Sequence, residues 1–178
     1  MRLKKYLYHI IGKLFGKLKY RKIKIFTVDD VEYYSKLVQV NLQKMGYNDI
    51  KMFHNGEDII EYLKTDIPDC IILDHILSDG NKMNGIDVLK YIKLYYPSIN
   101  VIILSGQEKV EVAANMIKEG SYDYILKNSM TFFRLQNIIS HLETNINNEE
   151  QFKWHDKTLR MILLSVILLS WCFIYTLL

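Results

Sequence analysis

The chain has 178 residues, of which 49% are hydrophobic, so it can bury the core of one domain and still carry further segments. Its net charge of +3 is uneven, because residues 1–22 hold eight Lys and Arg and no acidic residue, which leaves 15 basic against 20 acidic residues elsewhere. A mildly acidic body argues against nucleic-acid binding, and two Cys without metal-ligand spacing indicate a reducing compartment.

Residues 1–22 have the pattern of a basic amphipathic helix. Apolar side chains recur at positions 3, 6, 7, 10, 11, 14, 15 and 18, which is the spacing of one helical face. Four lysines lie off this stripe, so such a helix can lie on an anionic membrane surface. The alternative is that the stripe packs against the domain or a partner. We favour membrane lipid as its partner.

From residue 23 onward, short apolar runs alternate with helical patterns. Strands are predicted at 23–28, 50–53, 70–74, 99–104 and 122–126. Helices are predicted at 32–45, 57–64, 86–96, 108–119 and 131–145. Five strands that alternate with five helices predict an α/β fold, in which a doubly wound parallel sheet is covered by helices on both faces.

The last part of the chain divides into a polar and an apolar segment. Residues 147–157 are polar and carry charges of both signs, which is typical of a linker. Residues 161–178 contain no charge, and a helix of that length spans about 27 Å, close to the hydrocarbon thickness of a bilayer. We predict a transmembrane helix at 158–178. The basic residues just before it place the preceding domain on the cytoplasmic side of the inner membrane.

Polar side chains end four of the predicted strands. Asp29 and Asp30 follow the first strand, Asp74 ends the third, Ser105 follows the fourth and Lys127 follows the fifth. In a sheet of strand order 2-1-3-4-5, these ends converge on one crevice. Clustered carboxylates repel unless a cation lies among them, and their hard oxygen atoms suit Mg²⁺. With an ammonium and a hydroxyl nearby, the set has the groups that phosphoryl transfer needs. Taken alone, Asp74 fits a nucleophile, a metal ligand or a cap of the next helix.

These residues lie in segments that resemble the receiver domain of bacterial response regulators. The matching segments are IFTVDD at 25–30, CIILDHIL at 70–77, VIILSGQ at 101–107 and YDYILK at 122–127. The resemblance implies a flavodoxin-like fold of strand order 2-1-3-4-5 over residues 23–146. It also implies that Asp74 accepts a phosphoryl group from a histidine kinase or a histidine phosphotransfer protein.

The same resemblance assigns roles around Asp74. Four groups are expected to hold Mg²⁺: Asp29, Asp30, Asp74 and the backbone carbonyl of Ile76. Two side chains are expected to stabilise the phosphoryl group: Ser105 and Lys127. Tyr124 matches the switch aromatic of the family, although an ordinary aromatic residue on an edge strand is the alternative. Ile76 and Gln107 flank the approach of the hydrolytic water. Because neither holds a water firmly in place, we predict a slowly decaying phosphoprotein.

The chain departs from the family pattern in two places. Asn128 follows Lys127, where the family has a proline after a cis peptide bond. The loop Ser78–Asn84 runs longer than usual, and Ser78 stands where a proline often lies. His75, beside Asp74, is expected to be a packed or solvated loop residue, because successive strand residues point to opposite faces.

The sequence therefore predicts a membrane-anchored, single-domain response regulator without an output domain. It would not be an enzyme in the usual sense, and it would signal through contact with an unidentified downstream protein, without nucleic acid. The alternative is a membrane-bound interaction module whose receiver fold works without phosphorylation. A metal-dependent phosphatase is a third possibility, but no substrate pocket is suggested. The intact acidic set favours the first reading, because a scaffold does not need mutually repelling carboxylates.

Overall fold

The structure is a computed structural model that describes residue 10, residues 20–77 and residues 83–177. The chain divides into two compact units, one of Lys22–His141 and one of Met1–Arg21 with Leu142–Leu178. Most of residues 1–22, which carry the amphipathic pattern, and most of the loop Ser78–Asn84 lie outside the described residues. Those two predictions therefore stay predictions.

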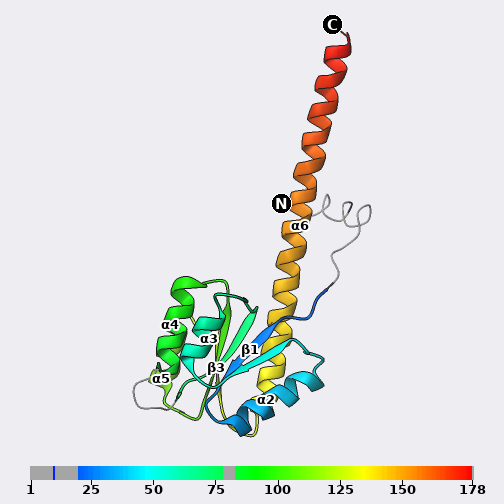
Figure 1. Cartoon of the computed structure of the whole chain (residues 1–178). Coiled ribbons are helices and arrows are strands. Elements are labelled where there is room, and N and C mark those ends of the chain that lie inside the picture. Colours follow the sequence, from blue (N-terminus) through cyan, green and yellow to red (C-terminus); the bar gives the residue numbers. More distant parts are fainter. Residues whose placement is uncertain (1–9, 11–19, 78–82, 178) are drawn as a thin grey trace. The chain divides into compact units, whose positions relative to one another are not determined.

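The first unit contains a five-stranded parallel sheet in the order β2-β1-β3-β4-β5, as predicted (Figure 1). The strands are β1 (Ile25–Val28), β2 (Ile50–Phe53), β3 (Cys70–Asp74), β4 (Asn100–Ser105) and β5 (Asp123–Leu126). β3 lies at the centre of the sheet, with Leu73 opposite Val28 of β1 and Asp74 opposite Leu104 of β4. All five residues of β3 are buried, which is why its sequence is a continuous apolar run up to Asp74.

Helices connect the strands and cover both faces of the sheet. They are α2 (Glu32–Lys44), α3 (Gly56–Tyr62), α4 (Gly85–Tyr95), α5 (Val110–Lys118) and α6 (Thr131–Leu177). Figure 1 shows α3, α4 and α5 on one face, and α2 and the first turns of α6 on the other. Local signals set several of the boundaries. Asn84 and Asp87 form a capping box at the start of α4, and Gly46 and Gly120 adopt positive φ just after α2 and α5.

The main core lies between the sheet and the helices α3 and α4. Alternate residues of the strands point into it, because side chains of a strand alternate between the two faces. Phe26 and Val28 of β1 and Ile71 and Leu73 of β3 meet buried residues of the two helices there: Ile59, Leu63, Val88, Leu89 and Ile92. This packing fixes β1 and β3 side by side, and with them the positions of Asp29 and Asp74.

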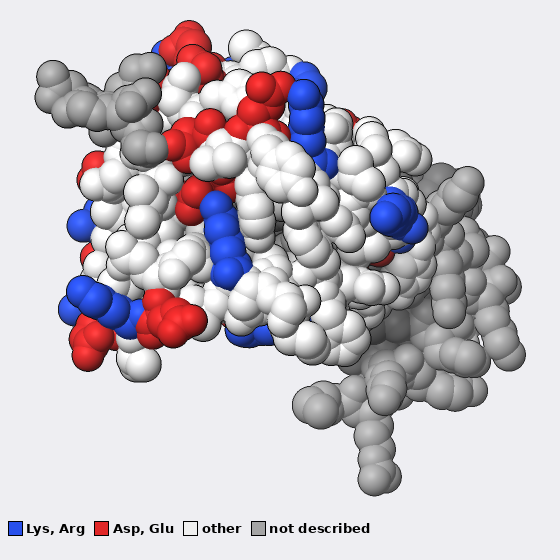
Figure 2. Space-filling view, turned by 90° about the horizontal axis from the view of Figure 1, so that it is seen from below, with Lys and Arg blue, Asp and Glu red and all other residues white. Residues whose placement is uncertain are grey.

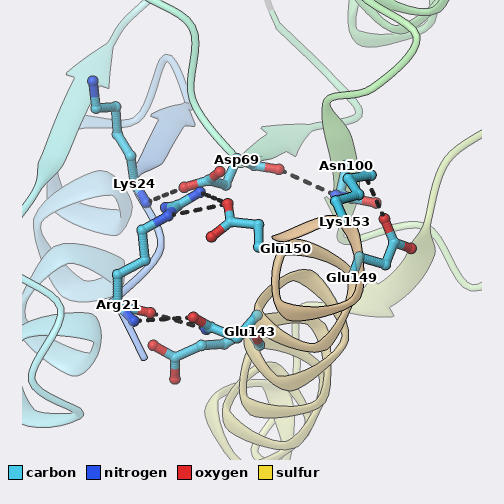
Figure 3. Close-up of polar contacts among 9 residues, drawn as sticks. Arg21, Lys24, Asp69, Asn100, Glu143, Glu149, Glu150 and Lys153 are labelled. Atoms are coloured by element: carbon cyan, nitrogen blue, oxygen red, sulfur yellow. Dashed lines mark hydrogen bonds and ion pairs between the residues drawn. The ribbon is translucent and has the colours of Figure 1, made fainter. Parts of the chain in front are cut away.

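Asp69 joins three strands at the amino end of the sheet. Its carboxylate accepts a hydrogen bond from the backbone amide of Lys24 at 2.8 Å, and its carbonyl accepts one from the Asn100 side chain at 3.2 Å (Figure 3). The Lys24 side chain in turn pairs with Asp66 at 2.6 Å. These polar contacts lie at the opposite end of the strands from Asp74.

The last helix differs from the predicted pattern. α6 was expected to end near residue 145 and to be followed by a linker at 147–157, but it runs without a break to Leu177. The mixed charges of this segment form pairs four residues apart on the helix, Glu149 with Lys153 and Asp156 with Arg160. No Gly or Pro occurs after Gly120, so nothing in the sequence interrupts the helix.

Within the second unit, the chain before β1 contacts α6. The Asn147 side chain accepts a hydrogen bond from the Arg21 amide and donates one to the Arg21 carbonyl, both at 3.0 Å. The Arg21 guanidinium pairs with Glu150 at 2.8 Å (Figure 3). In the described part of the chain, α6 is the one helix that is long and apolar enough to cross a membrane, by length and composition alone.

Candidate functional site

Three carboxylates meet at the carboxyl ends of β1 and β3. Asp29 and Asp30 follow β1, and Asp74 is the last residue of β3, so the pairing of these strands brings them together. One oxygen from each carboxylate lies within 4.8 Å of the others. Asp29 and Asp74 are buried, whereas Asp30 is partly exposed. Figure 2 views this edge of the sheet from below and shows acidic side chains gathered on it, with basic side chains among them.

Lys127 is the cation that pairs with two carboxylates of this cluster, Asp29 and Asp74. Its ammonium lies 2.8 Å from Asp29 Oδ2 and 2.6 Å from Asp74 Oδ2, and its side chain is 18% exposed. Burial lowers the pKa of Lys127, but the hydrogen bonds to Asp29 and Asp74 outweigh this effect and hold the pKa above its ordinary value. Lys127 therefore stays charged at neutral pH and offsets part of the repulsion between the two buried carboxylates.

Backbone amides fix the orientation of both buried carboxylates. Asp74 Oδ1 accepts a hydrogen bond from the Ile76 amide at 3.2 Å, and Asp29 Oδ1 accepts one from the Val31 amide at 2.9 Å. Each carboxylate thus uses one oxygen for an amide and the other for Lys127. Burial raises the pKa of Asp74, and the hydrogen bond from Lys127 opposes this rise only in part. Asp74 is therefore an oriented, partly desolvated carboxylate beside a positive charge.

Ser105 and Tyr124 are linked through the backbone of Gln107. Ser105 Oγ is fully buried and accepts a hydrogen bond from the Gln107 amide at 3.0 Å. The Tyr124 hydroxyl donates to the Gln107 carbonyl at 2.8 Å, and its ring is buried. Ser105 and Tyr124 are thus each hydrogen-bonded to the backbone of the same residue.

The neighbourhood of Ser105 also contains His75. His75 is partly buried, which agrees with the expected packed loop residue rather than a solvated one. Its Nδ1 lies 3.4 Å from Ser105 Oγ. Burial lowers the pKa of His75, while the charge of Asp74 opposes that effect. The contact was not foreseen, because His75 is the first residue after β3, where strict alternation no longer fixes the direction of a side chain.

The structure thus brings together Asp29, Asp30, Asp74 and Lys127, and places Ser105 at the end of the adjacent strand β4. The side chain of Ile76, expected to flank the water path, is 48% exposed. No peptide bond is cis in the described residues, so the Lys127–Asn128 bond is trans.

One contact of the site was not predicted from the sequence. The Tyr34 ring lies over the Lys127 ammonium. The available signal was the place of Tyr34 in the first turn of the helix that follows Asp30.

Gly85 allows α4 to begin directly against the end of β3. A Cβ atom at this position would lie 2.3 Å from the Asp74 carbonyl oxygen and 2.6 Å from that of His75. Both neighbours are backbone atoms, which cannot rotate away as a side chain can. The Gly85 amide also donates to the His75 carbonyl at 3.2 Å. The absence of a Cβ atom at this glycine therefore permits the close approach of α4 to the backbone of Asp74 and His75.

Comparison with known proteins matches most of this chain to a protein family. The model of the response regulator receiver domain matches residues 25–140. An NtrX-like response regulator of Rickettsia felis is 37% identical over 106 residues, which is 60% of this chain and 22% of the relative. The transcriptional regulatory protein ZraR of Salmonella typhimurium is 32% identical over 115 residues, which is 65% of this chain and 25% of the relative. The chain therefore spans a quarter or less of the length of these two relatives.

Solved structures give the same result. The receiver domain of NtrX from Brucella abortus is 25% identical, has a TM-score of 0.62, and the match covers 68% of this chain and 98% of that chain. The receiver domain of a LuxO repressor protein from Vibrio parahaemolyticus is 27% identical, with a TM-score of 0.65 and coverage of 73% and 96%. By its fold, its acidic cluster and these matches, the chain belongs to the response regulator receiver domain family.

Proposed function

We propose that this chain is a membrane-anchored response regulator that accepts a phosphoryl group on Asp74 from a histidine kinase or a histidine phosphotransfer protein. The observation that carries the proposal is the Lys127 ammonium, which contacts Asp29 and Asp74 together at the carboxyl end of the sheet. A buried carboxylate pair that shares one lysine gives little stability by itself, whereas it suits a site that must neutralise a transferred phosphoryl group.

The transfer uses the groups described above. An Asp74 oxygen attacks the phosphorus of the donor in line, and a new O–P bond forms as the P–N bond of the phosphohistidine breaks. Lys127 stays charged and neutralises a phosphoryl oxygen, and Ser105 donates a hydrogen bond to another. Ile76 and Gln107 would control the access of water during hydrolysis.

The acidic cluster fits Mg²⁺. Its donors are hard carboxylate oxygens from three residues, within 4.8 Å of one another, and Asp30 is partly open to solvent. Asp29, Asp30, Asp74 and the Ile76 carbonyl would hold the ion. When bound, the ion would supply positive charge that the phosphoryl oxygens need.

The decisive experiment is phosphorylation of the full-length protein by acetyl phosphate with Mg²⁺, followed by intact mass spectrometry. We expect the wild type to gain one phosphoryl group and Asp74→Asn to gain none. Asp66→Asn is the matched control, because Asp66 pairs with Lys24 away from the site, and it should behave as the wild type. A wild type that stays unmodified would support the alternative, an interaction module that works without phosphorylation.

The membrane anchor rests on the apolar end of α6. Lys153, Lys157 and Arg160 precede the uncharged segment, and these basic residues would keep the receiver domain on the cytoplasmic side of the inner membrane. Deletion of residues 158–178 is expected to move the protein from the membrane to the soluble fraction. Wild-type protein should resist extraction by high salt, and release by salt alone would contradict a spanning helix.

The output surface is proposed to be the face of α5, β5 and the first turns of α6. Val110, Ile117 and Tyr122 are exposed, and Tyr124 is a buried residue of β5. The downstream partner would be a protein. The ZraR relatives are named as transcriptional regulatory proteins, but the match covers only a quarter of their length. The absence of a nucleic-acid partner therefore stays a prediction.

A further inference from the structure

Tyr34 contacts the lysine of the phosphoryl site. It lies in the first turn of α2, and the Lys127 ammonium is 4.3 Å from the centroid of its ring. The same ammonium is hydrogen-bonded to Asp29 and Asp74. The cation therefore has carboxylates as two neighbours and an aromatic face as a third. This distance is well within the range of a cation–π interaction.

The Tyr34 ring is held in this position by its surroundings. It stacks on Phe132 in the first turn of α6, with ring centroids 6.2 Å apart and an interplanar angle of 27°. Its backbone amide donates to the Val31 carbonyl at 2.9 Å. Burial raises the pKa of the Tyr34 phenol, so the ring is neutral and its face attracts a cation at physiological pH.

A fixed aromatic face can restrict the position of the flexible Lys127 side chain. Its four-carbon chain has many rotamers, and the two carboxylates fix it only while both keep their charge. When one Asp74 oxygen becomes bonded to phosphorus, negative charge moves outward to the phosphoryl oxygens. A cation–π contact depends weakly on direction, so the ring can keep the ammonium above Asp74 while its anionic partner changes.

We propose that Tyr34 is a positioning residue for phosphoryl transfer, whose ring holds the Lys127 ammonium over Asp74. The inference rests on the proposed function, because it names a residue that acts on Asp74 through Lys127. It predicts that the aromatic face matters and that the hydroxyl does not.

The test compares initial rates of phosphorylation of the full-length protein by acetyl phosphate with saturating Mg²⁺. Tyr34→Leu is expected to lower the rate roughly fivefold, which corresponds to about 1 kcal/mol. Tyr34→Phe keeps the ring and should restore the wild-type rate. Tyr33→Leu is the matched control, because Tyr33 is 75% exposed one residue earlier, and its rate should equal that of the wild type.

Two measurements separate positioning from a general structural role. In a Lys127→Met background, Tyr34→Leu should have no further effect on the rate, because the cation on which the ring acts is gone. By NMR, the Lys127 Cε protons should lie upfield in the wild type and in Tyr34→Phe, owing to the ring current, and should lose that shift in Tyr34→Leu.

The outcomes distinguish this inference from the proposed function. A Tyr34→Leu rate equal to the wild type, or a Tyr34→Phe rate as low as that of Tyr34→Leu, would overturn the inference while the phosphorylation of Asp74 stands. If the wild type is not phosphorylated at all, the proposed function fails. The ring-current shift of Lys127 would then still show whether the contact exists.

Discussion

Replacement of Lys127 by Met is expected to lower the free energy of unfolding of the receiver domain by about 3 kcal/mol at pH 7. The variant leaves Asp29 and Asp74 buried at the same strand ends without their shared cation. Removal of one partner of a buried ion pair usually costs this much or more, and the lower figure suits a lysine that is partly open to solvent.

The stability that Lys127→Met loses should increase as the pH rises. Burial already raises the pKa of Asp74, and the variant removes the hydrogen bond that opposes this rise. Between the unfolded value of about 3.9 and the raised folded value, the folded state binds more protons than the unfolded state, so stability falls as the pH rises. The variant should therefore lose more stability at pH 7 than at pH 4, and Mg²⁺ should restore part of the loss at pH 7.

Pulse proteolysis of the full-length protein in urea would measure these changes. Lys24→Met is the matched control, because the Lys24–Asp66 pair is more exposed and its loss should cost under about 1 kcal/mol. An equal loss in the two variants, or a Lys127→Met loss that is the same at both pH values, would show that the site is less desolvated than its geometry implies.

Replacement of Gly85 by Ala is expected to destabilise the domain by about 3 kcal/mol, the upper end of the usual cost of overpacking. The new methyl group would overlap the backbone carbonyls of Asp74 and His75, at 2.3 and 2.6 Å. Relief of this overlap requires α4 to move away from the end of β3. Because that movement disturbs the backbone of Asp74, phosphorylation by acetyl phosphate should slow as well.

Gly106→Ala provides the control for the Gly85 variant. Gly106 is also a glycine beside the site, but a Cβ atom there meets nothing within 4 Å. Its stability should stay within about 0.5 kcal/mol of the wild type. Urea unfolding of both variants decides the matter, and a Gly85→Ala variant as stable as Gly106→Ala would mean that α4 docks more loosely than described.

The fold could be predicted from local patterns. The run from Cys70 to Leu73 is apolar at every position because β3 is paired on both sides and covered on both faces. The strand ends then carried the polar residues of the site, as expected for a parallel sheet. The extent of α6 differs from the prediction. Mixed charges predict a linker at 147–157, but Glu149 and Lys153, and likewise Asp156 and Arg160, have the spacing of helical pairs.

Contacts across the site could not be predicted in the same way. The sequence places Lys127 and Tyr34 at element ends, but their distance depends on how α2 and β5 lie against the same edge of the sheet. The contact of His75 with Ser105 depends on the path of the chain after β3, which no periodicity describes. Gly85 likewise carries a turn signal in the sequence, whereas its steric role follows only from the docking of α4.

The strand order also implies that two parts of the site open locally at different rates. The residues on the central strands open slowly, and those at the edge strand open faster. Asp29 and Asp74 follow β1 and end β3, which have a hydrogen-bonded neighbour on each side, so their amides become free only when much of the domain opens. Tyr124 belongs to β5 and Lys127 directly follows it, and β5 is an edge strand that is paired with β4 alone. Fluctuations of β5 can therefore move Lys127 and Tyr124 while Asp29 and Asp74 stay in place.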